Sequence, residues 1–287
     1  MILLTKLEHK LAVVKIGLTA FVLMFCVVCM ADPVMRTSRK RGPLQGKVKI
    51  VRSSGYDAMG PGEAESKLFD KYNYSVDSFS SAGLKLCTRW ILRGEMIGWA
   101  EYKYDAKGNK IEESIYDEDM QLGVMRIFRY DASGHLEEER SYSAWDPRVF
   151  ATKYVCIGGR LAIKERDSME RIVYSYNGIG QVVEETLISF HHPGKIVKQY
   201  KYDHKGRISS ETQIFSLEAL STTYTFDYDE HDNQVLAEET ANDGLVIRRT
   251  ESEYAYDSHG NWICCLEDAE NDFPTPKRLS LREIEYY

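Results

Sequence analysis

Residues Tyr102–Asn109 read YKYDAKGN, and this stretch recurs along the chain with small changes. Each clear copy has an aromatic residue, a Tyr-Asp or Tyr-Asn pair two positions later, and in most copies a Gly three positions after that. The copies, including a worn one at the third place, begin at Tyr102, Phe128, Tyr154, Tyr174, Tyr200, Phe226 and Tyr254. Their spacings are 26, 26, 20, 26, 26 and 28 residues. A repeated structural unit therefore organises residues 102–268.

Each part of the repeat has a physical reason in a β-hairpin. Aromatic residues at i and i+2 lie on one face of a strand. Asp at the first turn position accepts hydrogen bonds from backbone amides, and Gly accepts the left-handed conformation that closes the hairpin. Asp232, a residue type that tolerates this conformation, replaces Gly in one copy. The predicted structural turn residues are Asp105, Gly108, Asp131, Gly134, Asn177, Gly180, Asp203, Gly206, Asp229, Asp257 and Gly260.

The repeat predicts an all-β fold. Each unit supplies two strands and two turns, and short turns make neighbouring strands antiparallel. Because a single unit cannot bury its aromatic face, neighbouring units stack against each other. We expect an up-and-down meander of hairpins over residues 74–287, forming an elongated sheet that is twisted or coiled. Residues 32–73 are predicted to be a linker with a short helix at 63–71, and Leu279–Tyr287 a last strand at the edge, after a loop at 269–278.

This pattern resembles the YD-repeat (Rhs-type) family, whose signature is a Tyr-Asp hairpin with a Gly shortly after the Asp. The resemblance implies an extracytoplasmic β-repeat protein, of the kind used in bacterial surface proteins and large toxin-delivery shells, and a sheet that coils. This chain has a longer unit than is usual in that family and too few units to wrap a cargo chamber, so the resemblance favours a short envelope-associated member. MORN-type and antitoxin-like hairpin repeats are a second resemblance, but the Gly-aromatic spacing that they need is missing.

The N-terminus predicts export. Lys6, Lys10 and Lys15 precede the apolar run Ile16–Met30, and Ala31 follows. This arrangement is typical of a cleaved secretory signal over residues 1–31. An uncleaved single-pass membrane anchor and a buried helix are the alternatives. The predicted location is extracytoplasmic, in the periplasm, at the cell surface or secreted, with a membrane-anchored protein as the alternative.

Charge and cysteine content narrow the possibilities further. The formal net charge is -7, which gives no electrostatic basis for binding nucleic acid. Four cysteines follow the leader, at Cys87, Cys156, Cys264 and Cys265. They permit three disulfide pairings in an oxidising compartment, or free thiols. Cys264 and Cys265 would point to opposite faces of a strand, which disfavours a bridge between them.

Few residues suggest chemistry. Three turn histidines, each near a turn aspartate, are weak candidates for a metal site if the turns stack into a ladder; otherwise these turns are solvated. These candidates are His204, His231, His259, Asp203, Asp229 and Asp257. His191-His192 lie in another predicted turn without further ligands at suitable spacing. The glutamate runs Glu137–Glu139 and Glu238-Glu239 indicate a solvated acidic face. No phosphate-binding loop or nucleophile motif occurs, so we expect neither a cofactor nor enzymatic activity.

These observations predict a non-enzymatic protein that offers a binding surface. The broad face or the edges of the sheet would contact a protein or a polysaccharide at the cell envelope. The tyrosine rows, with Trp90, Trp99 and Trp262, are either core packing or a stacking surface for such a partner. A structural spacer is one alternative. A glycan-acting hydrolase is a less favoured one, and it would require a pocket with two close carboxylates, one of them with a raised pKa.

Overall fold

The computed structural model describes residues 43–58, 73–167, 169–217, 220–271 and 277–287. All of the regular structure in these ranges is β. The predicted signal at 1–31 and the predicted helix at 63–71 lie outside the described residues. The strands are β1 Val48–Ala58, β2 Tyr74–Phe79, β3 Lys85–Leu92, β4 Glu95–Tyr104, β5 Lys110–Asp117, β6 Leu122–Tyr130, β7 Leu136–Ser143, β8 Asp146–Ile157, β9 Arg160–Arg166, β10 Glu170–Tyr176, β11 Val182–Ser189, β12 Lys195–Tyr202, β13 Ile208–Phe215, β14 Leu220–Tyr228, β15 Gln234–Ala241, β16 Val246–Tyr256, β17 Trp262–Asn271 and β18 Lys277–Tyr286.

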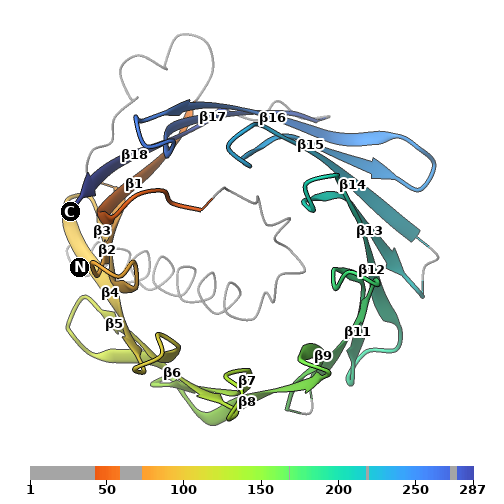
Figure 1. Ribbon diagram of the computed structural model, residues 1–287, viewed down its shortest axis with the longest axis horizontal. Helices are drawn as coiled ribbons and strands as arrows, with labels where there is room; N and C mark the ends of the chain where they lie inside the picture. The colour runs from red at the N-terminus through yellow and green to blue at the C-terminus, as the bar shows by residue number, and fades with distance from the viewer. Residues whose placement is uncertain (1–42, 59–72, 168, 218–219, 272–276) are drawn as a thin grey trace, which may run out of the picture. The chain divides into compact units, whose positions relative to one another are not determined.

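The strands form one antiparallel meander that closes into a barrel (Figure 1). Every strand pairs with the next one along the chain, and β18 pairs with β1. The all-β meander of hairpins is confirmed, but the prediction of an open, elongated sheet is wrong. The reason is β1: the segment taken as a linker contains the strand Val48–Ala58, which covers the edge that β18 would otherwise leave open. Closing the sheet removes both of its exposed edges.

The closing pair β18–β1 is a repeat hairpin whose two strands come from opposite ends of the sequence. In the β16–β17 hairpin, whose strands are consecutive in sequence, Tyr256 pairs with Trp262 across the turn, and a β-bulge shifts the register at the next pair. Tyr286 pairs with Val48 in the same way, again followed by a bulge. The amide of Tyr287 donates to the Lys47 carbonyl at 2.9 Å, as the turn aspartates do to the residue four positions on. Residues 44–47 therefore occupy the place of a repeat turn.

The repeat tyrosines point into the barrel. The face that carries them includes Lys198, Glu211 and Cys265, which are 7%, 8% and 0% exposed. On the opposite face the side chains of Lys103 and Arg249 are 62% and 43% exposed. Side chains converge on the concave side of a closed sheet and spread apart on its convex side. The tyrosine face is therefore the inner one.

Hydroxyl groups of the second repeat tyrosines join neighbouring hairpins. Successive hairpins do not pair along their whole length. Strands β5 and β6 pair from Glu112 onward, so Lys110, which pairs with Tyr104 of β4, has no partner residue in β6. The hydroxyl of Tyr130 donates to the Lys110 carbonyl at 2.8 Å. Equivalent bonds run from Tyr104 to Lys85, Tyr176 to Leu161, Tyr202 to Val182 and Tyr228 to Ile208. In the last repeat it is the first tyrosine, Tyr254, that donates to a backbone carbonyl of the preceding hairpin, that of Gln234. Each satisfies a backbone acceptor that the offset between hairpins would otherwise leave unpaired.

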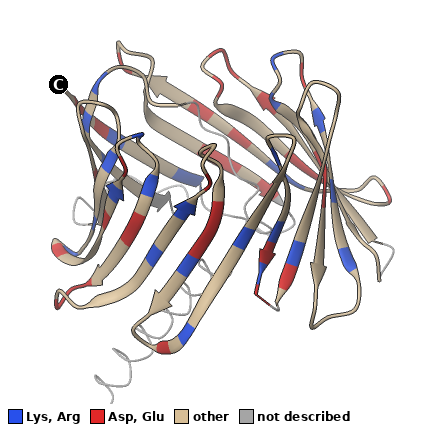
Figure 2. Cartoon of the chain, turned by 60° about the horizontal axis from the view of Figure 1, so that its bottom comes forward, with Lys and Arg blue, Asp and Glu red and all other residues tan. Residues whose placement is uncertain are grey.

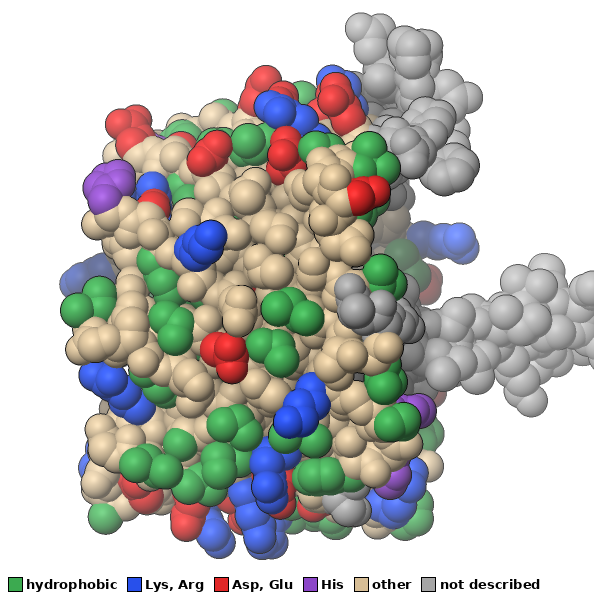
Figure 3. Space-filling model, turned by 90° about the vertical axis from the view of Figure 1, so that its right-hand side faces the viewer, with side chains coloured by type: hydrophobic (Ala, Val, Ile, Leu, Met, Phe, Trp, Pro, Cys, Tyr) green, Lys and Arg blue, Asp and Glu red, His purple; other side chains and the backbone are tan. Residues whose placement is uncertain are grey.

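The outer wall is polar. Figure 2 shows charged residues along the strands as well as at the turns, and Figure 3 shows hydrophobic side chains of one side scattered among polar ones. Glu138 and Arg140, for example, form an ion pair of 3.0 Å on the outer face within β7, and Lys103 and Glu112 form one of 2.8 Å near the β4–β5 turn. In the described ranges, no helix is both long and apolar enough to cross a membrane.

The hairpin turns form two rims. One, the aspartate rim, carries the repeat turns, from β4–β5 to β16–β17. The other, the apolar rim, carries the alternate loops, among them β3–β4, β5–β6, β7–β8, β11–β12, β13–β14 and β15–β16. The last predicted loop, 269–278, is shorter than expected, because β17 extends to Asn271 and β18 begins at Lys277.

Candidate functional site

The turn aspartates on the aspartate rim accept hydrogen bonds from backbone amides of their own turns. One carboxylate oxygen of Asp105 accepts the amides of Lys107 and Asn109, both at 2.8 Å. The side-chain hydrogen bond from Asn109, followed by these backbone bonds, lowers the pKa of Asp105. Asp131, Asn177, Asp203, Asp229 and Asp257 accept backbone amides in the same arrangement. Gly108 has φ +85, and the glycines at 134, 180, 206 and 260 are also left-handed.

Histidines of the last two turns are wedged between successive hairpins. The ring of His231 lies 4.1 Å from the ring of Tyr256, and that of His259 lies 3.9 Å from the ring of Tyr286. The two tyrosine hydroxyls donate to Asp229 and Asp257 of the preceding turns. Two of the predicted metal candidates thus pack against aromatic rings rather than point at a common centre.

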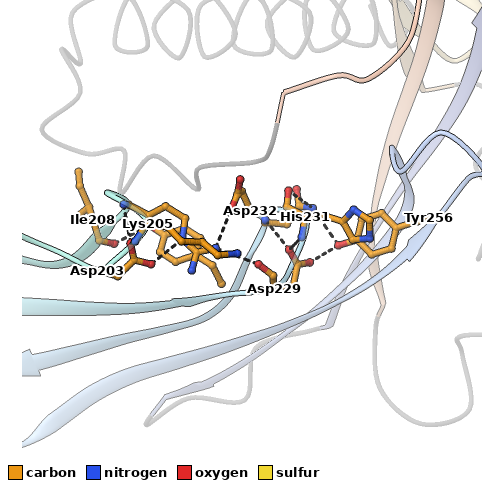
Figure 4. A network of polar contacts seen from close by, with 10 residues as sticks. Asp203, Lys205, Ile208, Asp229, His231, Asp232 and Tyr256 are labelled. Atoms are coloured by element: carbon orange, nitrogen blue, oxygen red, sulfur yellow. Dashed lines mark hydrogen bonds and ion pairs between the residues drawn. The ribbon is translucent and has the colours of Figure 1, made fainter.

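Figure 4 shows the polar network around Asp203, Asp229 and His231. In the turn before that of His231, Arg207 makes the corresponding ring contact: it binds Asp203 at 2.7 Å and Asp232 at 2.8 Å, and its guanidinium lies 4.6 Å from the centre of the Tyr228 ring. His204 does not join the contacts made by His231 and His259. Within the described ranges no group of three or more His, Cys, Asp or Glu side chains is gathered as a metal site. These side chains therefore connect successive turns of the aspartate rim and contribute to the fold.

The glutamate runs do not form one acidic face. Glu138 and Glu139 alternate across the sheet. Glu138 binds Arg140 at 3.0 Å on the outer face, and Glu139 accepts the Tyr154 hydroxyl at 3.1 Å on the inner one. In the second run, Glu238 lies 3.5 Å from Arg249, and Glu239 accepts the Tyr224 hydroxyl at 3.3 Å. The prediction of a solvated acidic face is wrong, because side chains alternate along each strand and each face supplies partners.

An inner cluster contains two carboxylates and one amine. Lys198 lies 3.4 Å from Glu211, and in the strand register it stands opposite Glu185. Burial raises the pKa of Glu185, and it also raises the pKa of Tyr200, which is hydrogen-bonded to that carboxylate. Neither Glu185 nor Glu211 lines the hollow on β10–β13 or the cavity at the aspartate rim, which other described residues form.

A hollow of about 450 Å³ lies on strands β10–β13. Ser175, Glu184, Gln199 and Thr212 line it and stand opposite one another in consecutive strands, as a single row on the outer face. Gln199 donates to Glu184 at 3.2 Å, and the Thr212 hydroxyl lies 3.1 Å from that of Thr223 on the next strand. Val183, Tyr200 and Lys201 complete the lining. The row consists of hydroxyl, carboxylate and amide groups spaced by the distance between strands, about 4.8 Å.

A smaller cavity of about 280 Å³ lies at the aspartate rim, beside the closing hairpin. Its wall includes His231, His259 and Trp262. Trp262 is only 3% exposed, and the Arg282 guanidinium stacks 3.6 Å from the centre of its ring. Trp99 instead stacks on Tyr116 on the outer wall, with 4.8 Å between ring centres. The predicted tryptophans therefore do not form one stacking surface.

The four cysteines of the described ranges form no disulfide with one another, and of these four only Cys265 is buried. Cys264 pairs with Leu281 and Cys265 with Ser280, which places the two neighbours on opposite faces of β17. His191 and His192 lie exposed in the β11–β12 loop. Sequence reasoning did not find the outer polar row, because its members share no motif; the signal was the alternation of Ser, Thr, Gln and Glu with the tyrosines.

No protein-family model matches the chain, and no curated protein matches it. Solved structures match at low identity. A porin-like protein from Bacteroides uniformis shares 9% identity and a TM-score of 0.40, over 85% of this chain and 99% of the other. A porin-like protein from Bacteroides vulgatus shares 15% identity and a TM-score of 0.35, over 70% and 97%.

A crystal structure of TcdB2-TccC3-TEV shares 13% identity and a TM-score of 0.36 with this chain. The match covers 72% of this chain but only 12% of that much longer one. Likenesses of this size carry no argument about function, so the proposals below rest on the residues themselves.

Proposed function

We propose that this protein is a non-enzymatic, extracytoplasmic barrel of the YD-repeat type that binds a polysaccharide of the cell envelope on its outer wall. The observation that carries the proposal is the hollow of about 450 Å³ on β10–β13. Its lining row offers hydroxyl donors and acceptors, a carboxylate and an amide in cross-strand register. A sugar chain laid across the strands presents hydroxyl groups at a comparable repeat, and each can pair with one member of the row.

The polar outer wall is consistent with binding of a water-soluble ligand. A barrel that spans a bilayer carries a continuous apolar band on its outer face. Here the outer face has ion pairs such as Glu138–Arg140 within β7, and Ser, Thr and Gln around the hollow. This wall is suited to solvent and to polar ligands. The N-terminal leader of basic residues and an apolar run supports the proposed export.

The test is binding of bacterial surface glycans. The full chain is applied to an array of such glycans, and hits are measured by affinity electrophoresis. The double variant Glu184→Ala/Gln199→Ala removes the centre of the row, and we expect it to weaken binding at least about tenfold, since each lost hydrogen bond with a charged or amide group contributes about 1 kcal/mol or more. The control Lys103→Ala/Glu112→Ala removes another cross-strand pair from the outer face and should bind as the native chain does.

Two results would overturn the proposal. One is an array without any hit for a folded protein. The other is equal loss of binding in both double variants, which would show that the glycan does not recognise the hollow. Hydrolysis of a bound glycan, lost in Glu185→Gln, would instead favour the hydrolase alternative.

A further inference from the structure

The two rims of the barrel differ in apolar exposure. The structure describes five loops of the apolar rim in full: β3–β4, β5–β6, β7–β8, β11–β12 and β15–β16. Each of them carries an exposed large hydrophobic side chain, in the loop or at the strand end beside it. These residues are Leu92 at 43% exposure, Met120 at 71%, Leu122 at 41%, Trp145 at 59%, Phe190 at 46%, Leu245 at 64% and Val246 at 47%. Exposed groups of this kind mark contact surfaces when they recur together.

The aspartate rim does not share this character. Its turns at β6–β7, β12–β13, β14–β15 and β16–β17 contain no exposed large hydrophobic residue. Ile157, at 67% exposure at the end of β8, and Ile179, at 81% in the β10–β11 turn, are exceptions at that rim. The contrast means that apolar exposure follows one end of the barrel and is not a general feature of its loops.

Contacts between loops hold the apolar side chains in place. The ring of Trp145 lies over Gly123, at the start of β6, so closely that a Cβ there would come within 2.6 Å of it. Leu217, 67% exposed, lies over Gly194 in the same way, again 2.6 Å from the position of an added Cβ. Each glycine leaves room for the side chain of the next hairpin, so the exposed rings and branches have defined positions.

We propose that the apolar rim docks onto the surface of a lipid bilayer. In a closed meander all alternate loops end at the same side, so their tips can meet one planar partner together. The apolar tips are separated by polar loop residues, such as Asp119, Asp146 and His191. A second protein copy needs a continuous complementary patch of about 800 Å² per partner. A bilayer can accept each tip separately, since lipid has no fixed shape to match.

The charges limit how deep the rim enters. Close to the apolar rim, the outer wall carries the ion pair Arg249–Glu238, whose charges stay in water. Near the tips, acidic residues such as Asp117, Glu118 and Asp119 stand against cationic residues such as Arg148 and Lys195. Such a rim does not depend on anionic lipid and would sit at the level of the headgroups, where Trp is favoured.

The experiment is flotation of the full chain with phosphatidylcholine vesicles, with and without added phosphatidylglycerol. We expect the protein to float with both kinds of vesicle and to remain bound at high salt. The variant Trp145→Ser/Leu245→Ser should bind at least about tenfold more weakly, because burial of one large apolar side chain already accounts for about a tenfold change in partition. The control Ile157→Ser/Ile179→Ser removes equally exposed side chains from the aspartate rim and should float as the native chain does.

A second measurement keeps the test independent of folding defects. Vesicles should shift the tryptophan emission of the native chain to shorter wavelength, and Trp145→Phe should remove the shift while leaving flotation in place. Absence of flotation, or equal loss in both double variants, overturns the proposal. A concentration-dependent dimer in sedimentation that the Trp145→Ser/Leu245→Ser variant abolishes would also overturn it and assign the rim to a second copy. Glycan binding at the wall is unaffected by any of these outcomes.

Discussion

Removing the hydroxyl of a single repeat tyrosine should destabilise the whole barrel. Tyr130→Phe keeps the ring on the inner face and deletes one atom, the oxygen that donates to the Lys110 carbonyl at 2.8 Å. Lys110 lies before the point where β5 begins to pair with β6, so the β6 ladder offers its carbonyl no amide. The bond therefore supplies the donor for this carbonyl, beside a contact of 4.4 Å between the Lys110 ammonium and the centre of the Phe128 ring.

The magnitude follows from the hydrogen bond and the acceptor that it leaves behind. A net loss of about 1 kcal/mol is typical for one such bond, and a carbonyl left without a donor adds a further penalty. Tyr130 is half-buried, so water replaces part of the bond. We expect the free energy of unfolding to fall by about 1–2 kcal/mol, which for a domain of this size lowers Tm by about 3–6 °C.

The assay is urea unfolding followed by tryptophan fluorescence, with thermal unfolding as a second measurement. Tyr116→Phe is the matched control, because Tyr116 lies on the outer face, stacked on Trp99, and its hydroxyl makes no hydrogen bond to the described residues. It should change the free energy of unfolding by less than about 0.5 kcal/mol. Equal effects of the two substitutions would refute the role assigned to the inner hydroxyls.

Three further predictions concern the aspartate rim and the closing hairpin. Tyr286→Ala removes a ring and a hydrogen bond to Asp257 from the closing β18–β1 hairpin. It should lower the free energy of unfolding by about 3 kcal/mol and make this hairpin sensitive to limited proteolysis. An unchanged urea midpoint would contradict the role of Tyr286 in closing the barrel. Gly260→Ala places a Cβ at φ +82 and 3.4 Å from His231, so thermal unfolding should show a loss of about 1–2 kcal/mol, whereas Gly178→Ala, at ordinary φ with open space, should be neutral. Partial burial opposes ionisation of Asp257, but hydrogen bonds from Tyr286 and two amides outweigh it and lower the pKa of Asp257 from 3.8. The ionised carboxylate therefore stabilises the fold above pH 3.8, and this stabilisation is lost as pH falls through the lower pKa of the folded state. The difference in urea midpoint between the native and Asp257→Asn proteins should shrink on acidification.

The repeat hairpins could be read from the chain because their determinants are local. Asp203 and Gly206 are three residues apart, and the carboxylate and the left-handed glycine act on the same few backbone atoms. The alternation of Tyr224 and Phe226 with threonines likewise assigns one face of β14 without reference to any distant residue. The candidate sites were less accessible, since the row through Glu184 and Gln199 depends on how four strands are aligned with one another.

Closure of the barrel needed the tertiary structure. Val48–Ala58 holds a Tyr-Asp pair, Tyr56-Asp57, but no aromatic residue two positions before it. In the closing hairpin this segment supplies only the outgoing strand and the end of a turn, while Tyr286 supplies the tyrosine from the far end of the chain. Local preference determines that each segment is a strand and which way its side chains alternate. Whether the last strand remains an edge or meets the first depends on the summed twist and offset of all the hairpins between them, a property that no single repeat contains.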